Sequence, residues 1–174
     1  ASKMDRRRNS DARGVGEAWT PIREDLIHTG IDCSSRAVHA TLIDDEGVLI
    51  ESVKFLAVGK TAADRFPDIA KGLAALPDIV YGGTVAIEKP LYFKNPHSTI
   101  SISEVVGAVK GILEISHIPY RTVDNRVWKK EVVGMGNASK EDIMKYATKH
   151  FSSQFVEQDW ADAACIAEWS RINA

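Results

Sequence analysis

Four acidic residues lie at positions where a carboxylate is costly unless something binds it. Asp32 ends one apolar segment, and Glu88 follows another. Asp159 and Asp162 are three residues apart, which places them on one face of a helix. Carboxylates gathered at one point repel one another unless a divalent cation binds them, and oxygen ligands select hard ions such as Mg²⁺ or Mn²⁺. If the fold brings these acids together, the sequence predicts a divalent metal site.

Each acid also has an ordinary structural interpretation. Asp32 could begin a turn, and Glu88 could pair with a basic neighbour on the surface. Asp159 and Asp162 could simply stabilise the start of a helix, where negative charge is favourable. The residues alone leave both interpretations open.

The elements that must position these acids begin at Leu26. Apolar segments separated by turn residues predict a three-stranded antiparallel meander, after which strands alternate with helices. Thr61 is the expected cap of the first helix, and Pro77 lies just past its expected end. This order predicts an α/β fold with a mixed sheet and helices on its faces. The expected strands cover residues 26–32, 37–43, 48–58, 79–87 and 118–123, and the expected helices cover residues 61–76, 98–117, 127–133, 139–150 and 159–171.

The size and composition fit one globular domain. The chain has 174 residues, of which 44% are hydrophobic and 26% are charged, so disorder, collagen and coiled coil are disfavoured. No apolar run approaches the roughly 18 residues of a membrane-spanning helix, and the two cysteines suit a reducing compartment. Residues 26–174 are expected to form a single domain. Residues 1–25 are expected to be a flexible N-terminal extension, with a basic arm for a polyanion as the alternative.

Four segments resemble the motifs of RuvC-type Holliday-junction resolvases, a family of the ribonuclease H-like nuclease superfamily. Residues 30–36 (GIDCSSR) resemble the first motif, residues 85–88 (VAIE) the second, and residues 158–167 (QDWADAACIA) the terminal helix motif. Residues 132–140 (VVGMGNASK) are similar to the family's stretch that leads into a helix. The four segments follow the family's order across residues 30–169.

This resemblance implies a ribonuclease H-like fold, with three antiparallel strands followed by parallel strands and with helices on both faces. It also implies that residues 26–174 are a RuvC-like nuclease domain. The activity it implies is that of a metal-dependent, structure-selective DNA endonuclease that resolves four-way (Holliday) junctions and accepts other branched DNA. Its paired hydrolytic cuts would use two metal ions and leave a 5′-phosphate and a 3′-hydroxyl.

The same resemblance implies roles for the four acids. Asp32 would bridge two Mg²⁺ ions, for which Mn²⁺ could substitute. Glu88 would bind one ion, and Asp159 and Asp162 would bind the other or share it. Part of the family has a histidine in the last motif, but both acidic positions are Asp here, so no catalytic histidine is expected. Family members are homodimers, so this chain is expected to be one; the apolar face of the helix at 98–117 could form the dimer contact or pack on the sheet.

The expected DNA surface follows the second and third motifs. Residues 120–149 carry seven basic and four acidic side chains, a surplus that also suits a solvated helix face. The resemblance places Lys129 and Lys140 at DNA-contacting positions, and it places Leu91 where the family has a wedge at the junction centre. The aromatic residues beyond Leu91 could stack on bases or close the core. The residues expected to bind DNA are Arg36, Tyr92, Phe93, Arg126, Lys129, Lys130 and Lys140.

Two other function classes stay open. A catalytically weak or inactive module of the same fold would bind branched DNA without cutting it, although the four intact acids disfavour this. An actin-like or sugar-kinase-like protein would bind nucleotide, but that fold needs a second domain for which this chain is too short. Cys33 and Ser34 stand where the family commonly has Pro-Gly, so cutting of forks and flaps as well as junctions is plausible.

The net charge of −2 does not exclude a polyanionic partner. If bound cations neutralise the four acids, 22 basic residues face 20 acidic ones, and the charge becomes +2. The surplus is mild, so non-specific DNA binding should be weaker than for a strongly basic protein. The expected location is the cytoplasm, bacterial or that of the host if the protein is phage-encoded, with no membrane association.

Overall fold

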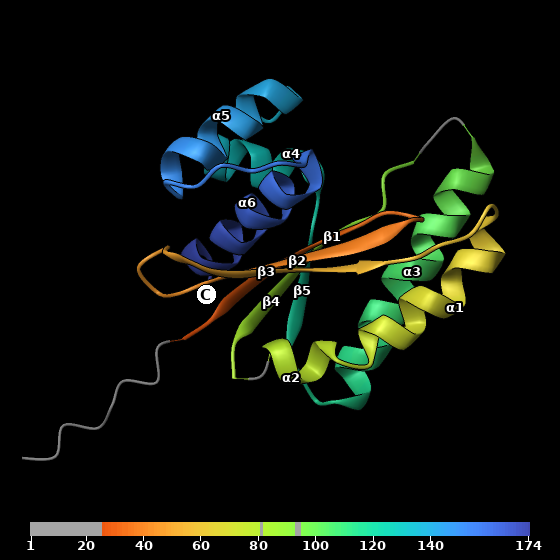
Figure 1. Cartoon of the computed structure of the whole chain (residues 1–174). Helices are drawn as coiled ribbons and strands as arrows, with labels where there is room; N and C mark the ends of the chain where they lie inside the picture. The colour runs from red at the N-terminus through yellow and green to blue at the C-terminus, as the bar shows by residue number, and fades with distance from the viewer. Residues whose placement is uncertain (1–25, 81, 93–94) are drawn as a thin grey trace, which may run out of the picture.

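The computed structural model describes residues 26–80, 82–92 and 95–174, and a central sheet organises them into layers (Figure 1). The expectation of a flexible extension at residues 1–25 lies outside the described residues. No helix in the described ranges is long and apolar enough to cross a membrane. The elements in chain order are β1 (His28–Cys33), β2 (Ala37–Ile43), β3 (Leu49–Leu56), α1 (Ala62–Leu73), α2 (Leu76–Val80), β4 (Thr84–Glu88), α3 (Pro96–Ile115), β5 (Tyr120–Val123), α4 (Asn125–Trp128), the π-helix η1 (Lys129–Val133), α5 (Lys140–His150) and α6 (Gln158–Ile172).

The sheet combines an antiparallel half with a parallel half. Its strand order is β3-β2-β1-β4-β5. β1 and β2 pair antiparallel, as do β2 and β3, whereas β4 pairs parallel to both β1 and β5. The expected α/β fold with a ribonuclease H-like mixed sheet is confirmed.

Alternating side chains of the strands build a core on each face of the sheet. Ile31 of β1 and Ile87 of β4 point toward α1, α2 and α3 and are fully buried there. Ala86 of β4 points to the other face, where it packs with residues of α5 and α6. Figure 1 shows α1–α3 on one side of the sheet and α4–α6 on the other. Val105 and Val109 of α3 are 2% and 0% exposed in the first core, so that face packs on the sheet and is not available for a dimer contact.

Helix α6 lies unusually close to β1 because one strand residue has no side chain. A Cβ atom added to Gly30 would lie 2.1 Å from the carbonyl oxygen of Ala163 and 2.1 Å from the amide nitrogen of Ala167. Only glycine therefore fits at this position, and small residues on the facing side of α6 allow the approach. This close approach sets the distance between α6 and the sheet, and so the position of the acids on α6 relative to those at the strand ends.

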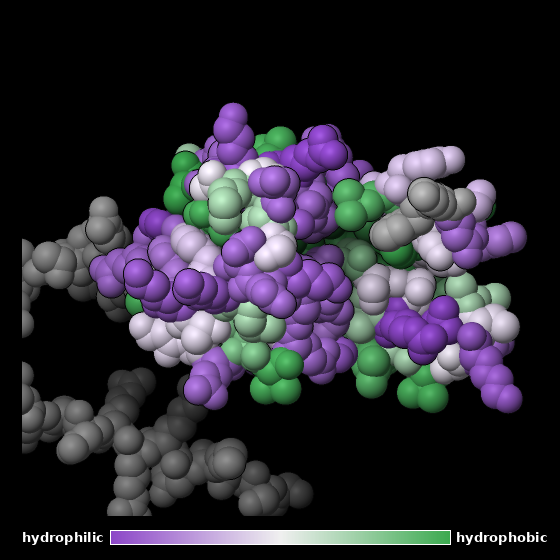
Figure 2. All heavy atoms as spheres, turned by 90° about the horizontal axis from the view of Figure 1, so that it is seen from above, coloured by the Kyte–Doolittle hydropathy of each residue, from purple (hydrophilic) through white to green (hydrophobic). Residues whose placement is uncertain are grey.

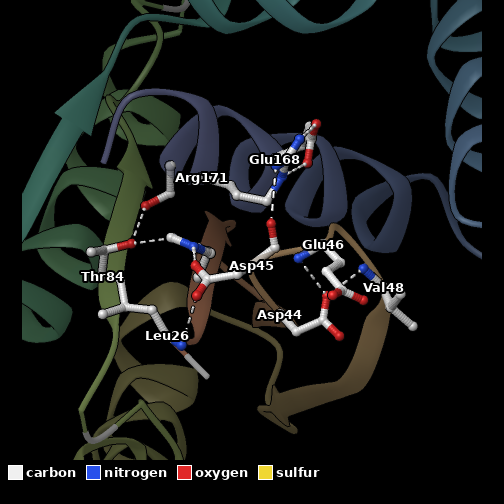
Figure 3. A network of polar contacts seen from close by, with 10 residues as sticks. Leu26, Asp44, Asp45, Glu46, Val48, Thr84, Glu168 and Arg171 are labelled. Carbon is white, nitrogen blue, oxygen red and sulfur yellow. Dashed lines mark hydrogen bonds and ion pairs between the residues drawn. The ribbon is translucent and has the colours of Figure 1, made fainter. Parts of the chain in front are cut away.

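A polar network joins the C-terminal end of α6 to the sheet (Figure 3). His28 at the start of β1 lies 2.7 Å from Thr84 Oγ1 and 2.8 Å from Asp45 Oδ1. Arg171 donates two hydrogen bonds of 2.7 Å to Glu168 and one of 3.2 Å to the carbonyl oxygen of Asp45. The network ties the β2–β3 turn, β1 and β4 to the C-terminal end of α6, in addition to the contact of its middle turns with Gly30.

Local patterns predicted most elements but misplaced the boundaries between the first helix and the fourth strand. Thr61 caps α1 through a capping box, as expected. The expected strand at 79–87 is wrong over its first part, because Leu76–Val80 form α2 and the chain turns at Gly82, where φ is +79°. Pro77 lies inside α2 near its start, where proline is tolerated because its missing N–H would have no partner there. The expected helix at 127–133 is a turn of α-helix followed by η1.

Candidate active site

The carboxyl ends of two parallel strands bring the first two acids together. The register pairs Ile31 of β1 with Ile87 of β4, so Asp32 and Glu88 follow one residue later at the same edge. Both side chains point to the face that α6 covers, because each follows a residue that points to the opposite face. Adjacent parallel strands ending in acids therefore place two carboxylates side by side.

Helix α6 adds a third carboxylate to this edge. Asp162 lies near the start of α6 and lines a cleft of about 320 Å³ together with Asp32 and Glu88. Lys129 and Lys140 line the same cleft. The cleft therefore combines three acids, which can hold cations, with two bases, which can hold phosphate.

Burial and mutual repulsion make these acids hard to ionise without a cation. Burial raises the pKa of Asp32 well above its ordinary value, and the neighbouring Glu88, Asp162 and Asp159 raise it further. Burial also raises the pKa of Glu88 and of Asp162. Three carboxylates with raised pKa values in one cleft are typical of a site in which a bound cation supplies the missing charge.

Two neighbours hold Glu88 in one orientation. Asn125 Nδ2 donates to Oε1 at 2.8 Å, and Trp128 Nε1 donates to Oε2 at 3.1 Å. Both donors belong to α4, which begins directly after β5. On the other side of the cleft, Gln158 Nε2 donates to Asp162 Oδ1 at 2.9 Å. Each acid keeps free lone pairs, because a carboxylate accepts about four hydrogen bonds or metal bonds.

The fourth acid, Asp159, lies near Asp32 but outside the cleft. Asp159 is not among the residues that line the cleft; its side chain is 43% exposed. It forms a second group with Asp32 and His39, in which one possible ligand atom of each residue lies within 4.8 Å of the others. Asp32 therefore belongs to two groups, one with Glu88 and Asp162 in the cleft and one with His39 and Asp159.

His39 is a member of this group that sequence reasoning missed. It lies opposite Asp32 in the antiparallel β1–β2 pair. Burial lowers the pKa of its imidazole, an effect that the charge of Asp159 partly opposes. The sequence signal that could have identified His39 was the short hairpin turn at residues 34–36. A turn of this length between antiparallel strands pairs Asp32 with residue 39.

The residues expected to bind DNA fall into two sets. Lys129 and Lys140 line the cleft, whereas Arg36, Arg126 and Lys130 are exposed outside it. The Lys129 ammonium also lies 5.5 Å from the ring centroid of Trp128. The surface over α4–α6, seen from above in Figure 2, is mostly hydrophilic with scattered apolar residues.

The loop after Glu88 projects apolar side chains outward. Leu91 lines the cleft and is 44% exposed, and Tyr92 is 86% exposed. The alternative that this loop closes the core is therefore wrong for Tyr92. Phe93 lies outside the described residues.

The mixed sheet with helices on both faces defines a ribonuclease H-like fold, and acids lie at its adjacent strand ends and on its last helix. The model of the family described as crossover junction endodeoxyribonuclease RuvC matches residues 28–168. The chain therefore belongs to the RuvC family, and the expected enzyme class, a hydrolase that acts on DNA, is confirmed.

Several relatives and solved structures are similar to this chain. The RuvC proteins of Salinibacter ruber and Marinobacter nauticus are 28% and 30% identical, over 82% and 81% of this chain and 83% of each relative. The RuvC of Brachyspira hyodysenteriae is 30% identical over a shorter stretch, 47% of this chain and 51% of that protein. A structure of Thermus thermophilus RuvC matches with a TM-score of 0.69 at 18% identity, covering 82% of this chain and 91% of that one. The T. thermophilus protein in complex with a Holliday junction substrate matches with a TM-score of 0.71 at 16% identity, covering 85% and 96%.

Proposed function

We propose that this chain is a metal-dependent endonuclease that resolves four-way DNA junctions and also cuts other branched DNA. The observation that carries the proposal is the cleft in which Asp32, Glu88 and Asp162 meet two lysines. Membership of the RuvC family supports the junction as the substrate. We further propose that residues 26–174 act as one nuclease domain and residues 1–25 as an extension to it.

The donor set suits two divalent ions. Asp32 would bridge them, with Glu88 and Asp162 on the cleft side and Asp159 on the other. The oxygen donors favour Mg²⁺, with Mn²⁺ as a substitute. Bound there, the ions supply an activated water and neutralise charge on the phosphate and on the leaving 3′ oxygen. The products would carry a 5′-phosphate and a 3′-hydroxyl.

The protein's own residues orient the acids and hold the DNA. Asn125 and Trp128 fix the plane of the Glu88 carboxylate, so its lone pairs point in a constant direction. Lys129 and Lys140 would contact phosphates beside the scissile bond, which positions the strand without reading its sequence.

Residues outside the cleft would hold the arms of the junction. Arg36, Arg126 and Lys130 are exposed and would contact phosphates further along the strands. Leu91 and Tyr92 project from the loop after Glu88 and would stack on unpaired bases at the branch point. Paired cuts on opposite strands need two sites at a defined separation, so we propose a homodimer. The bacterial relatives support a cytoplasmic location.

Cleavage of synthetic DNA by the Asp32→Asn variant tests this function. We expect wild-type protein with Mg²⁺ to cut a four-way junction into products that DNA ligase can rejoin. Asp32→Asn should not cut but should bind the junction within about threefold of the wild-type affinity, because the surface that grips phosphate is unchanged. The matched control is Asp78→Asn on α2, an exposed residue on the other face of the sheet.

The same assay compares four-way, three-way, flap and linear DNA and separates the alternatives. Cutting of the linear duplex as fast as the junction would contradict structure selectivity. Cutting by Asp32→Asn at the wild-type rate would contradict the site. Tight junction binding without cutting in either Mg²⁺ or Mn²⁺ would identify an inactive DNA-binding module instead.

A further inference from the structure

A buried histidine beside the carboxylates has no role in the function proposed above. His39 lies directly opposite Asp32 in the antiparallel register of β1 and β2, so both side chains are on the face that α6 covers. Its side chain is 1% exposed, and neither ring nitrogen makes a hydrogen bond of normal geometry among the described residues, although each lies within 4 Å of a carboxylate. Buried polar groups nearly always make well-formed hydrogen bonds, so a buried imidazole with only long contacts to acids is a candidate metal ligand.

The two ring nitrogens of His39 face different carboxylates. Nδ1 lies 3.8 Å from Asp159 Oδ2, and Nε2 lies 3.5 Å from Glu157 Oε2. Lys54 holds Glu157, because its Nζ donates to Oε2 at 2.6 Å. Trp160 packs edge-on against the imidazole with ring centroids 4.9 Å apart and limits its rotation.

Asp32, His39 and Asp159 offer three possible ligand atoms that lie near one another. One ligand atom from each of Asp32, His39 and Asp159 lies within 4.8 Å of the other two. Two ligands that each lie about 2.1 Å from one ion are about 4 Å apart or less. Three ligands of one ion at this distance are about 3.0–3.6 Å apart, so an approach of roughly 1–2 Å, which side-chain rotation can supply, would complete the set.

The position of Glu157 matches the usual partner of a metal-bound histidine. An imidazole that binds a metal through one nitrogen donates the other N–H to a carboxylate, which sets the tautomer and the ring plane. In His39 this arrangement places the proton on Nε2 toward Glu157 and leaves the Nδ1 lone pair on the side of Asp159.

We propose that His39 binds a divalent ion through Nδ1, together with Asp32 and Asp159, and that Glu157 orients the ring. This inference rests on the proposed function, in which Asp32 and Asp159 hold metal. An imidazole donor favours a transition-metal ion over Mg²⁺, whereas the Glu88 side of the site offers oxygen alone. The two ion positions therefore differ in metal preference, and Mn²⁺ occupies the His39 position in preference to Mg²⁺.

Pulsed electron paramagnetic resonance of bound Mn²⁺ tests the metal–nitrogen bond without any measurement of activity. The full chain receives one and then two equivalents of Mn²⁺ at neutral pH without DNA. A bound imidazole produces ¹⁴N hyperfine coupling, which changes to the ¹⁵N pattern when the histidines are labelled. We expect this coupling in wild type and in His97→Gln, a control at an exposed histidine of α3, and its loss in His39→Gln. Absence of the coupling in wild type, or its persistence in His39→Gln, overturns the proposal.

Metal titration of the same proteins tests the preference. His39→Gln should weaken Mn²⁺ binding about 10- to 100-fold and Mg²⁺ binding less than about threefold. Glu157 is 46% exposed, so Glu157→Ala leaves the core intact and serves if His39→Gln does not fold. Glu157→Ala should weaken Mn²⁺ binding about tenfold. Equal losses for the two metals, or no loss for Mn²⁺, overturn the proposal.

The outcomes also distinguish this inference from the proposed function. If ¹⁴N coupling depends on His39 but no DNA is cut in Mg²⁺ or Mn²⁺, the nuclease function fails and the metal ligand stands. If Mg²⁺ supports junction cutting but no coupling depends on His39, the nuclease function stands and this inference fails.

Discussion

Trp128 of α4 donates a hydrogen bond of 3.1 Å from its indole nitrogen to Oε2 of Glu88, at the end of β4. Trp128 is fully buried in the core between the sheet and α6, so packing sets its orientation. The core therefore orients a carboxylate of the candidate active site directly. A change in this one hydrogen bond should affect metal binding more than it affects folding.

Replacement of Trp128 by Phe should slow junction cleavage and weaken Mg²⁺ binding about 10- to 100-fold, because Glu88 loses an orienting donor. The smaller ring and the missing hydrogen bond should also lower the free energy of unfolding by about 1–3 kcal/mol. Titration calorimetry with Mg²⁺ and single-turnover cleavage measure the first effect, and denaturant unfolding measures the second.

Trp169→Phe is the matched control for this change. Trp169 is also nearly buried in the same core, and its Nε1 donates to Glu131 Oε2 at 2.7 Å, away from the cleft. This variant should lose a similar amount of stability and keep wild-type cleavage and Mg²⁺ affinity. Equal losses of activity in the two variants would show that destabilisation, not orientation of Glu88, is responsible.

The raised pKa of Asp32 predicts how the stability of the metal-free protein depends on pH. The folded protein holds the proton of Asp32 more tightly than the unfolded chain, whose Asp pKa is near 3.8. The stability that this proton confers is complete below the unfolded pKa and is lost as pH rises through the folded pKa. Asp32→Asn removes the buried charge, so the variant should be more stable than wild type at about pH 8, by a few degrees in Tm, since about 1 kcal/mol shifts Tm by about 2–4 °C in a chain of this size. Thermal unfolding in a chelating buffer from about pH 5 to about pH 8 measures the difference, which should shrink as pH falls.

Asp64→Asn should change stability with pH in the opposite direction to Asp32→Asn. Hydrogen bonds from Thr61 lower the pKa of Asp64, so its stabilising effect is present above the unfolded pKa and is lost as pH falls.

Added Mg²⁺ should raise the Tm of wild type more than that of Asp32→Asn. A metal-free Asp32→Asn protein that is less stable than wild type at about pH 8 would contradict the electrostatic account of the site.

Lys129→Ala and Lys140→Ala should each weaken junction binding and reduce its dependence on salt. Removal of one phosphate-binding lysine should reduce the slope of log K against log salt concentration by about 0.9. Burial raises the pKa of Glu88 and of Asp162, and the charge of Lys129 partly opposes this rise. Removal of Lys129 should therefore shift the loss of cleavage at acidic pH to higher pH. Binding measured by fluorescence anisotropy across a salt series, and cleavage across a pH series, check both effects.

Lys71→Ala provides the comparison for the lysine variants. Lys71 is exposed on α1, which covers the opposite face of the sheet. Its removal should leave the salt slope and the pH profile unchanged. If all three variants lower the slope equally, DNA binding follows net charge and not the lysines at the cleft.

Much of the fold could be predicted because its signals are local. Alternation and turn residues predicted the β1–β3 meander, and Thr61 as a cap residue predicted where α1 begins. The apolar run at 79–87 was wrongly predicted as one strand, because a short buried helix and a buried strand have similar hydrophobic residues. Ile79 and Val80 pack in the same core as Val85 and Ile87, so burial alone did not distinguish α2 from β4.

The sequence by itself determined that acids stand at the ends of two strands and one turn apart on the last helix, because these are properties of neighbouring residues. Only the tertiary structure decided that Asp162 enters the cleft while Asp159 faces His39. The physical reason is that packing across the sheet, not local sequence, sets the rotation and height of α6. Backbone contact between α6 and Gly30 brings the helix down onto β1, and the β1–β2 register places His39 opposite Asp32.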